Sequence, residues 1–128
     1  IIHKVDEFYT IEDGHRRDIV GDDSFIQLSS MNMEKGHTFR PHQHIWKSGE
    51  KEVIAQESWV VIKGSVECHF YDTDGELLGK PVLNVGDCSI TLGGGHNYLI
   101  LEHDTLVYEY KTGPYKGQKL DKVFLDEL

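Results

Sequence analysis

The residues best suited to chemistry are three histidines in the stretch GHTFRPHQH, residues 36–44, out of eight in the whole chain. Successive side chains of an extended strand point to opposite faces, so His42 and His44 share one face and Gln43 points away. Neutral imidazole is the commonest metal ligand among side chains, and it exchanges protons near neutral pH. The pair indicates either the beginning of a metal site or two ordinary hydrogen-bonded histidines.

Composition limits the partners of the protein. The chain has 128 residues with 22 Asp and Glu against 13 Lys and Arg, a net charge of -9. This charge opposes binding to nucleic acid or to an anionic membrane. No apolar run approaches the roughly 20 residues of a membrane-spanning helix. We therefore expect a soluble protein with a small-molecule partner, no nucleic acid and no membrane, folded as a single domain over residues 1–128.

The two cysteines, Cys68 and Cys88, are too few for a disulfide framework and lack Cys-x-x-Cys spacing. We expect both to be small buried hydrophobes in a reducing, cytoplasmic compartment.

The elements that must position the histidines have the pattern of β-strands. Glycines separate segments of strand length that alternate polar and apolar residues: residues 24–33, 57–72 in two pieces hinged at Gly64, 76–85, 96–103 and 105–110. Asp74-Gly75 is the strongest hairpin signal, and a tight turn at His103-Asp104 predicts that the last two segments pair. Many short strands at this spacing predict an all-β sandwich or barrel.

Two segments depart from the strand pattern. Residues 45–56 are polar and predict a loop or mobile flap beside His42 and His44. A helical turn or two is expected only near the end, within residues 119–128.

The spacing of glycine, histidine and glutamate resembles the two motifs of the cupin superfamily. The first motif, residues 36–64, matches at Gly36, His42, His44, Glu57 and Gly64, and the second, residues 86–100, keeps His96. The separation between His44 and Glu57 is about eight residues longer than usual. Glu50 and Glu52 are therefore competing acidic residues, although Glu57 alone keeps the family's spacing to the following glycine.

The resemblance implies a cupin double-stranded β-helix, which is a jelly-roll barrel with its site inside. The words RPHQHIWK and EYKTGPY are similar to small single-domain cupins of the WbuC type, which are associated with bacterial polysaccharide biosynthesis. Because cupins commonly pair their edge strands across an interface, we expect a homodimer.

The resemblance also implies a ligand set: His42, His44, Glu57 and His96. Three neutral imidazoles and one carboxylate suit one divalent transition metal, namely Fe, Mn, Ni, Co or Zn. A six-coordinate ion would keep two positions for water, oxygen or substrate, which is typical of a catalytic site.

Other polar residues are candidates for the remaining roles. Tyr98 shares a strand face with His96, so we expect it in the same cavity, and Lys47 and Glu109 are further acid or base candidates. Arg40 and His37 lie beside the ligand strand and are candidates for substrate binding, Arg40 through its bidentate fork.

Three hypotheses follow for the function. The first is an isomerase or epimerase in which the metal acts as Lewis acid on a sugar-like or keto substrate. The second is an Fe(II)-dependent dioxygenase. The third is a non-catalytic module or sensor that binds a small molecule, since binding and catalytic cupins share the same ligands.

Overall fold

Strands with one buried face build the molecule, and two antiparallel sheets result. The computed structural model describes residues 1–47, 53–115 and 117–127. In this part of the chain, sheet A is five-stranded, in the order β1 (Arg16–Asp18), β2 (Ile26–Met33), β12 (Thr105–Thr112), β6 (Glu57–Lys63) and β10 (Cys88–Thr91). Sheet B runs in the order β13 (Lys122–Phe124), β3 (His42–His44), β11 (Gly95–Ile100), β7 (Val66–Tyr71) and β8 (Leu77–Gly79), with β9 (Val82–Leu83) also paired to β7.

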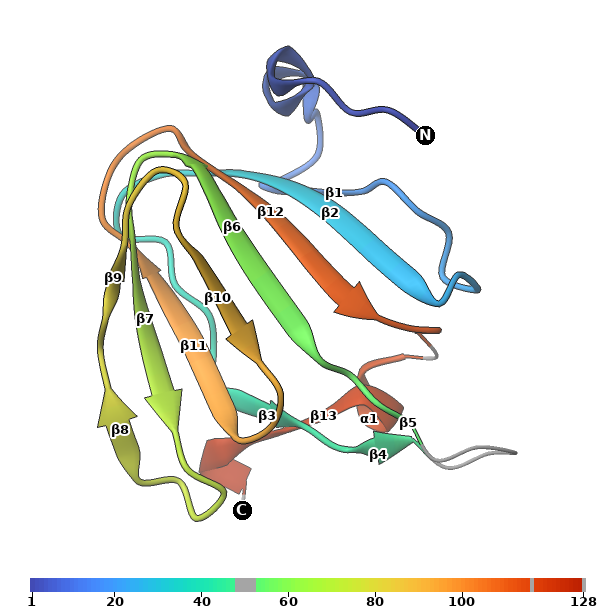
Figure 1. The fold of residues 1–128 in the computed structure, drawn as a ribbon, viewed down its shortest axis with the longest axis vertical. Coiled ribbons are helices and arrows are strands. Elements are labelled where there is room, and N and C mark those ends of the chain that lie inside the picture. The colour runs from blue at the N-terminus through green and yellow to red at the C-terminus, as the bar shows by residue number, and fades with distance from the viewer. Residues whose placement is uncertain (48–52, 116, 128) are drawn as a thin grey trace.

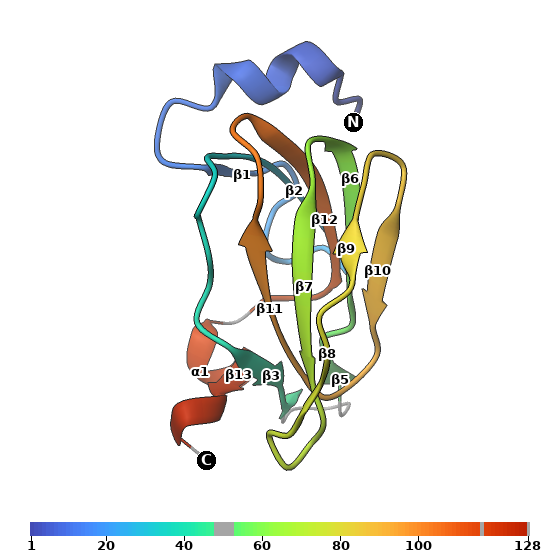
Figure 2. The ribbon, with the colours of Figure 1, turned by 90° about the vertical axis from the view of Figure 1, so that its left-hand side faces the viewer.

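The shorter elements lie at the two ends of the sheets. The 3-10 helix η1 (Val5–Thr10) lies at the end opposite the C-terminal segment (Figures 1 and 2). That segment contains the helix α1 (Gln118–Asp121), β13 and the 3-10 turn η2 (Leu125–Glu127). A small ladder of β4 (Trp46–Lys47) and β5 (Val53–Ile54) lies beside them. The described residues contain no helix long and apolar enough to span a membrane.

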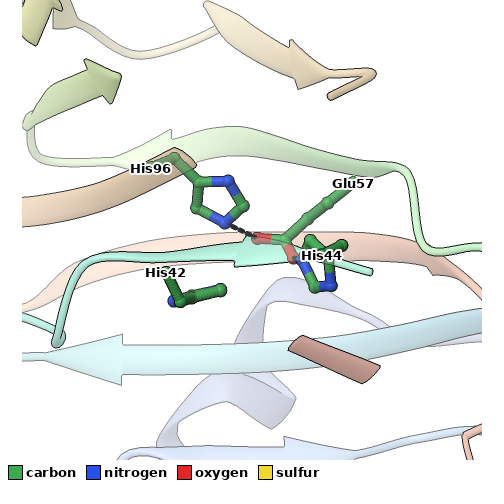
Figure 3. A group of neighbouring side chains, drawn as sticks. All are labelled: His42, His44, Glu57 and His96. Atoms are coloured by element: carbon green, nitrogen blue, oxygen red, sulfur yellow. Dashed lines mark hydrogen bonds and ion pairs between the residues drawn. The ribbon is translucent and has the colours of Figure 1, made fainter. Parts of the chain in front are cut away.

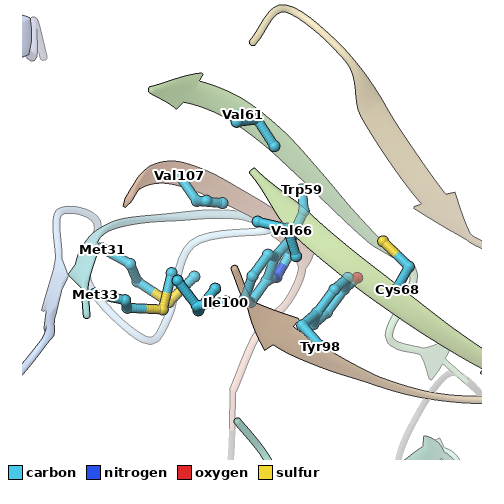
Figure 4. Close-up of a cluster of buried hydrophobic side chains, with 9 residues drawn as sticks. All are labelled: Met31, Met33, Trp59, Val61, Val66, Cys68, Tyr98, Ile100 and Val107. Atoms are coloured by element: carbon cyan, nitrogen blue, oxygen red, sulfur yellow. The ribbon is translucent and has the colours of Figure 1, made fainter. Parts of the chain in front are cut away.

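The hydrophobic core fills one end of the space between the sheets. Its buried members are Met31, Met33, Trp59, Val61, Val66, Cys68, Tyr98, Ile100 and Val107 (Figure 4). They come from β2, β6, β7, β11 and β12, so both sheets contribute. This burial removes apolar surface from water and fixes the two sheets against each other.

Two long strands, β6 and β11, divide their inward faces between this core and the cluster of His42, His44, Glu57 and His96. On β6, Glu57, Trp59 and Val61 are buried and alternate with less buried residues. On β11, His96 lies at one end of the strand and the core residue Ile100 lies at the other. The period of two along a strand therefore places polar and apolar side chains of the same face in separate layers.

Gly64 makes the link between β6 and β7 possible. Its φ is +83°, and a Cβ atom there would lie 2.3 Å from Oγ1 of Thr105. The predicted hinge between two strands is confirmed, with β6 in sheet A and β7 in sheet B.

Several other expectations are also confirmed. The all-β class and the double-stranded β-helix are observed, and the segment at residues 24–33 becomes β2. Asp74-Gly75 lies in the turn between β7 and β8, which pair antiparallel. The helical turn expected near the C-terminus is α1.

The prediction that residues 96–103 pair with residues 105–110 is wrong. β11 pairs with β3 and β7 in sheet B, whereas β12 pairs with β2 and β6 in sheet A. The tight turn does exist, with Asp104 at φ 58°, but it passes the chain from one sheet to the other. A hairpin and a connection between two sheets show the same local pattern, two alternating segments joined by a tight turn. The sequence pattern therefore could not distinguish the two.

Three further expectations need correction. Cys88 is exposed, while Cys68 is buried as expected. The segment at residues 45–56 is not a plain loop, because β4 and β5 pair within it. Residues 122–124 form a strand that joins β3, where only helical turns were expected.

Candidate metal centre

Three strands bring the four predicted ligands together. His42 and His44 lie on β3, Glu57 begins β6 and His96 lies on β11. β3 pairs with β11 so that His42 is directly opposite His96. Glu57 reaches them from the other sheet, and its carboxylate lies between the rings of His96 and His44 (Figure 3).

The donor atoms of these residues form a tight cluster. One ligand atom from each of the four lies within 4.8 Å of all the others. Nε2 of His44 is 3.0 Å from Oε2 of Glu57, and Nε2 of His96 is 3.2 Å from Oε1. Nδ1 of His42 lies 3.1 Å from the carbonyl oxygen of Arg40, to which it donates, so its Nε2 carries the lone pair.

Burial and mutual charge shift the pKa values of the cluster. Burial, with smaller contributions from His96 and Lys122, lowers the pKa of His42 to about 3. Burial also opposes the charge on His44, but hydrogen bonds to Asp121 and Glu57 outweigh it and raise its pKa to about 9. Burial raises the pKa of Glu57, but His96 and His44 outweigh it and hold the pKa well below its usual range.

The cluster fits a metal ion. Ligand atoms bound to one ion at about 2.2 Å lie at most about 4.4 Å apart. The four donor atoms, which lie within 4.8 Å of one another, therefore need to approach only slightly to bind one ion. His96 is fully buried, and within the described part of the chain its Nδ1 makes no hydrogen bond. A buried imidazole beside a carboxylate and two further imidazoles is the nitrogen and oxygen donor set that Fe, Mn, Ni, Co and Zn accept.

Asp121 contacts His44 at Nδ1, whereas Glu57 contacts the other ring nitrogen, and no motif in the sequence indicated Asp121. Its side chain is fully buried, and its Oδ2 lies 3.3 Å from Nδ1 of His44. A carboxylate on the second ring nitrogen fixes the tautomer of a ligating histidine and leaves Nε2 for the ion. Asp121 lies on α1, outside both motifs, and reaches His44 because β13 pairs with β3.

A cavity of about 280 Å³ opens beside the cluster and is lined by His42 and Glu57. This volume is just below the ~300–1,000 Å³ range of small-molecule sites. Phe39 and Trp59 form part of the wall, and three cationic side chains, Arg16, Lys111 and Lys122, also line it. None of these cations was expected from the sequence as a site residue, because they lie on β1, β12 and β13, outside both motifs.

Glu109 faces this cavity and is paired. It is 7% exposed, and its Oε1 accepts a hydrogen bond from Arg16 at 2.8 Å. Its Oε2 accepts another from Nε1 of Trp59 at 2.9 Å. Burial lowers the pKa of Arg16, but Glu109 and Asp18 outweigh burial and raise it above its ordinary value.

Tyr98 also lines the cavity. Its ring stacks on Trp59 with centroids 3.6 Å apart and an interplanar angle of 11°. Its hydroxyl lies 3.4 Å from Oγ of Ser89. Burial, with the charge of Glu57, raises the pKa of Tyr98 well above its ordinary value, so the hydroxyl keeps its proton at neutral pH.

The remaining candidates lie away from the cavity or outside the described residues. Arg40 is at the surface, where it pairs with Asp126 and with Glu127. His37 lies against His15, with ring centroids 4.4 Å apart. Neither lines the cavity.

Two competing ligands and one catalytic candidate cannot be placed. Glu50 and Glu52 lie outside the described residues, and so does the side chain of Lys47.

The two sheets and the enclosed histidine and glutamate cluster define the fold as that of the cupins, a double-stranded β-helix. No protein-family model matches the sequence, and no curated protein sequence matches it.

Solved structures with this fold are similar over most of the chain. KdgF from Halomonas sp. is 21% identical with a TM-score of 0.61, over 83% of this chain and 85% of that one. A conserved protein with a double-stranded β-helix domain from Klebsiella pneumoniae is 17% identical with a TM-score of 0.66, over 96% and 89% of the two chains. The capsular polysaccharide assembling protein CapF from Staphylococcus aureus is 16% identical with a TM-score of 0.69, over 90% of this chain but 33% of that one. At such identities the likeness establishes the fold and carries no activity across.

Proposed function

We propose that the protein is a metal-dependent enzyme of the isomerase or epimerase type that acts on a small sugar-like or keto substrate. One observation carries the proposal: the four donor atoms lie within 4.8 Å of one another, and two of their residues line a cavity. A structural metal site is closed, whereas a catalytic one has room for substrate beside the ion.

His42, His44, Glu57 and His96 would hold one divalent transition metal, Fe, Mn, Ni, Co or Zn. When bound, the ion supplies Lewis-acid polarisation of a carbonyl or hydroxyl oxygen. Asp121 keeps the ring of His44 oriented toward the ion through the contact of its carboxylate with Nδ1.

The cavity wall supplies the remaining functions. Phe39, Trp59 and Tyr98 present apolar ring surface that excludes water from the substrate. Glu109 is the residue best placed to hold or move a proton, because a carboxylate has about four lone-pair positions and its two described donors occupy two of them. The hydroxyl of Tyr98 is directed at Ser89, which makes it a weaker candidate than Glu109 for this role.

The resemblance in fold to CapF, a capsular polysaccharide assembling protein, supports a sugar-like substrate as the first class to test. The single domain and the homodimer expected from the sequence stay predictions, and light scattering would test the second.

The first experiment measures the metal content of untagged protein purified without chelator, by elemental mass spectrometry. About one transition-metal ion per chain is expected, lost in His42→Ala and in His96→Ala. His37→Ala is the matched control, because it removes a histidine of the same segment that lies outside the cluster. A wild-type protein that neither contains a metal nor takes one up on reconstitution would contradict the proposal.

The second experiment tests the reaction. Metal-loaded protein is incubated with aldose, ketose and keto-acid candidates in D2O, and NMR follows deuterium entering the carbon next to the carbonyl. Entry that requires the metal supports isomerisation or epimerisation. Metal-dependent consumption of dioxygen would support the dioxygenase instead, and binding without either reaction would support the sensor.

A further inference from the structure

Two lysines lie directly opposite metal-ligand candidates in the sheets. Lys111 on β12 is the cross-strand partner of Glu57 on β6. Lys122 on β13 is the cross-strand partner of His44 on β3. Opposed residues in an antiparallel pair share one face of the sheet, with Cβ atoms roughly 4.5–5.5 Å apart. Because Glu57 and His44 are directed into the molecule, each lysine is directed into it too, one from each sheet.

Both lysines line the cavity, and among the described residues Lys111 has one carboxylate within ion-pair distance while Lys122 has none. The side chain of Lys111 is 11% exposed, and its Nζ lies 3.6 Å from Oδ2 of Asp121 and 4.6 Å from the ring centroid of Tyr115. Lys122 is half-buried, and among the described residues its ammonium makes no hydrogen bond or ion pair. Ammonium groups in a confined cavity are costly unless an anion accompanies them.

Arg16, the third cation of the cavity, is already paired with carboxylates. Arg16 donates to Asp18 and to Glu109, each at 2.8 Å, so two carboxylates already occupy its guanidinium. Oδ2 of Asp121, the carboxylate beside Lys111, also lies 3.3 Å from Nδ1 of His44. The positive charge available to a bound molecule is therefore concentrated on Lys111 and Lys122, beside the ligand cluster.

We propose that Lys111 and Lys122 bind the acid group, a carboxylate or a phosphate, of a small substrate whose neighbouring oxygen reaches the metal ligands. The inference rests on the proposed function for the role of that oxygen, while the acid site itself follows from the two lysines. The cavity of about 280 Å³ limits the ligand to a small acid. Charge-assisted hydrogen bonds from two ammonium groups hold such a group more strongly than neutral ones do.

The test measures binding by isothermal titration calorimetry, with lactate and inorganic phosphate as probes. Propane-1,2-diol is the neutral counterpart of lactate, since a CH2OH group replaces the carboxylate. The variants are Lys111→Met and Lys122→Met, which keep much of the aliphatic length, and Lys122→Arg, which keeps the charge. Lys119→Met is the matched control, because Lys119 lies in the same C-terminal segment and is exposed. Each variant is measured with metal and after stripping with chelator.

Wild-type protein is expected to bind at least one of the two anions and to bind the diol far more weakly. Each methionine variant is expected to weaken anion binding about 10-fold or more, as for the loss of one charge-assisted hydrogen bond. Lys119→Met should bind like the wild type, and Lys122→Arg should recover part of the affinity. Preference for lactate identifies a carboxylate as the acid, and preference for phosphate identifies a phosphate.

Unchanged anion affinity in both methionine variants would overturn the inference, as would equal affinity for lactate and the diol, or no binding of either anion. Should Lys122→Met fail to fold, Lys111→Met and Lys122→Arg decide the question. The two proposals fail separately. If the protein takes up no metal but binds anions through the lysines, only the proposed function is refuted. If the protein takes up metal but its anion binding does not depend on the lysines, only the acid site is refuted.

Discussion

Replacement of Gly64 by alanine tests whether the close approach between the β6–β7 link and β12 is as tight as the structure has it. A Cβ atom at this position would lie 2.3 Å from Oγ1 and 3.0 Å from Cα of Thr105, so the backbone of β12 has to shift. The residue also has φ +83°, which disfavours any side chain. Left-handed backbone costs about 1–2 kcal/mol, and overpacking costs about 1–3 kcal/mol more. We expect Gly64→Ala to lose about 2–5 kcal/mol of unfolding free energy.

Gly36→Ala is the matched control, because Gly36 has φ +90° with nothing within 4 Å of its missing Cβ. This variant should lose only the conformational part, about 1–2 kcal/mol. Both variants gain the same small benefit from a less flexible unfolded chain, which cancels in the comparison. The difference between them, about 1–3 kcal/mol, is the contribution of the contact with Thr105.

Urea unfolding followed by tryptophan fluorescence measures this difference, with Trp59 as a buried reporter. Chelator is present throughout, so that a bound ion does not stabilise the variants unequally. In thermal unfolding the gap corresponds to roughly 4 °C per kcal/mol for a chain of this length. If Gly64→Ala were as stable as Gly36→Ala within about 0.5 kcal/mol, the close contact would be refuted.

Two further predictions concern thiol reactivity and pH. A thiol reagent should modify the native protein once, at the exposed Cys88. Cys68 should not react, because it is fully buried and burial raises its pKa to about 12. Mass spectrometry should find two modifications only after unfolding, and one fewer in Cys88→Ser. Burial lowers the pKa of His15 below 6.5, with smaller contributions from His37 and Arg16. Between the lowered pKa and 6.5 the unfolded chain therefore binds more protons than the folded protein, so the contribution of His15 to stability should fall as the pH drops below 6.5. Urea titrations from pH 7 downward should show a shallower loss for His15→Gln, and an unchanged slope would contradict this assignment.

Spacing along the chain determined which residues can be metal ligands. Two histidines one residue apart on a strand must share a face, and this is observed for His42 and His44. The motif spacing favoured Glu57 and His96, and their side chains join the same cluster. The alternation within residues 57–72 likewise puts Val66 and Cys68 on one face of β7, and both are buried. Faces follow from the local period of two, which needs no knowledge of neighbouring strands.

Tertiary structure decided which strands are neighbours and in what register. The turn at Asp104 could have closed a hairpin, and only packing sends β12 into the other sheet. The pairing of β12 with β6 brings Lys111 opposite Glu57, and the separate pairing of β13 with β3 brings Lys122 opposite His44. The pairing of β13 with β3 also brings Asp121 to the cluster, from a segment that follows both motifs. A one-residue change of register would turn these side chains to the other face, so the wall of the cavity depends on long-range pairing that the order of residues does not display.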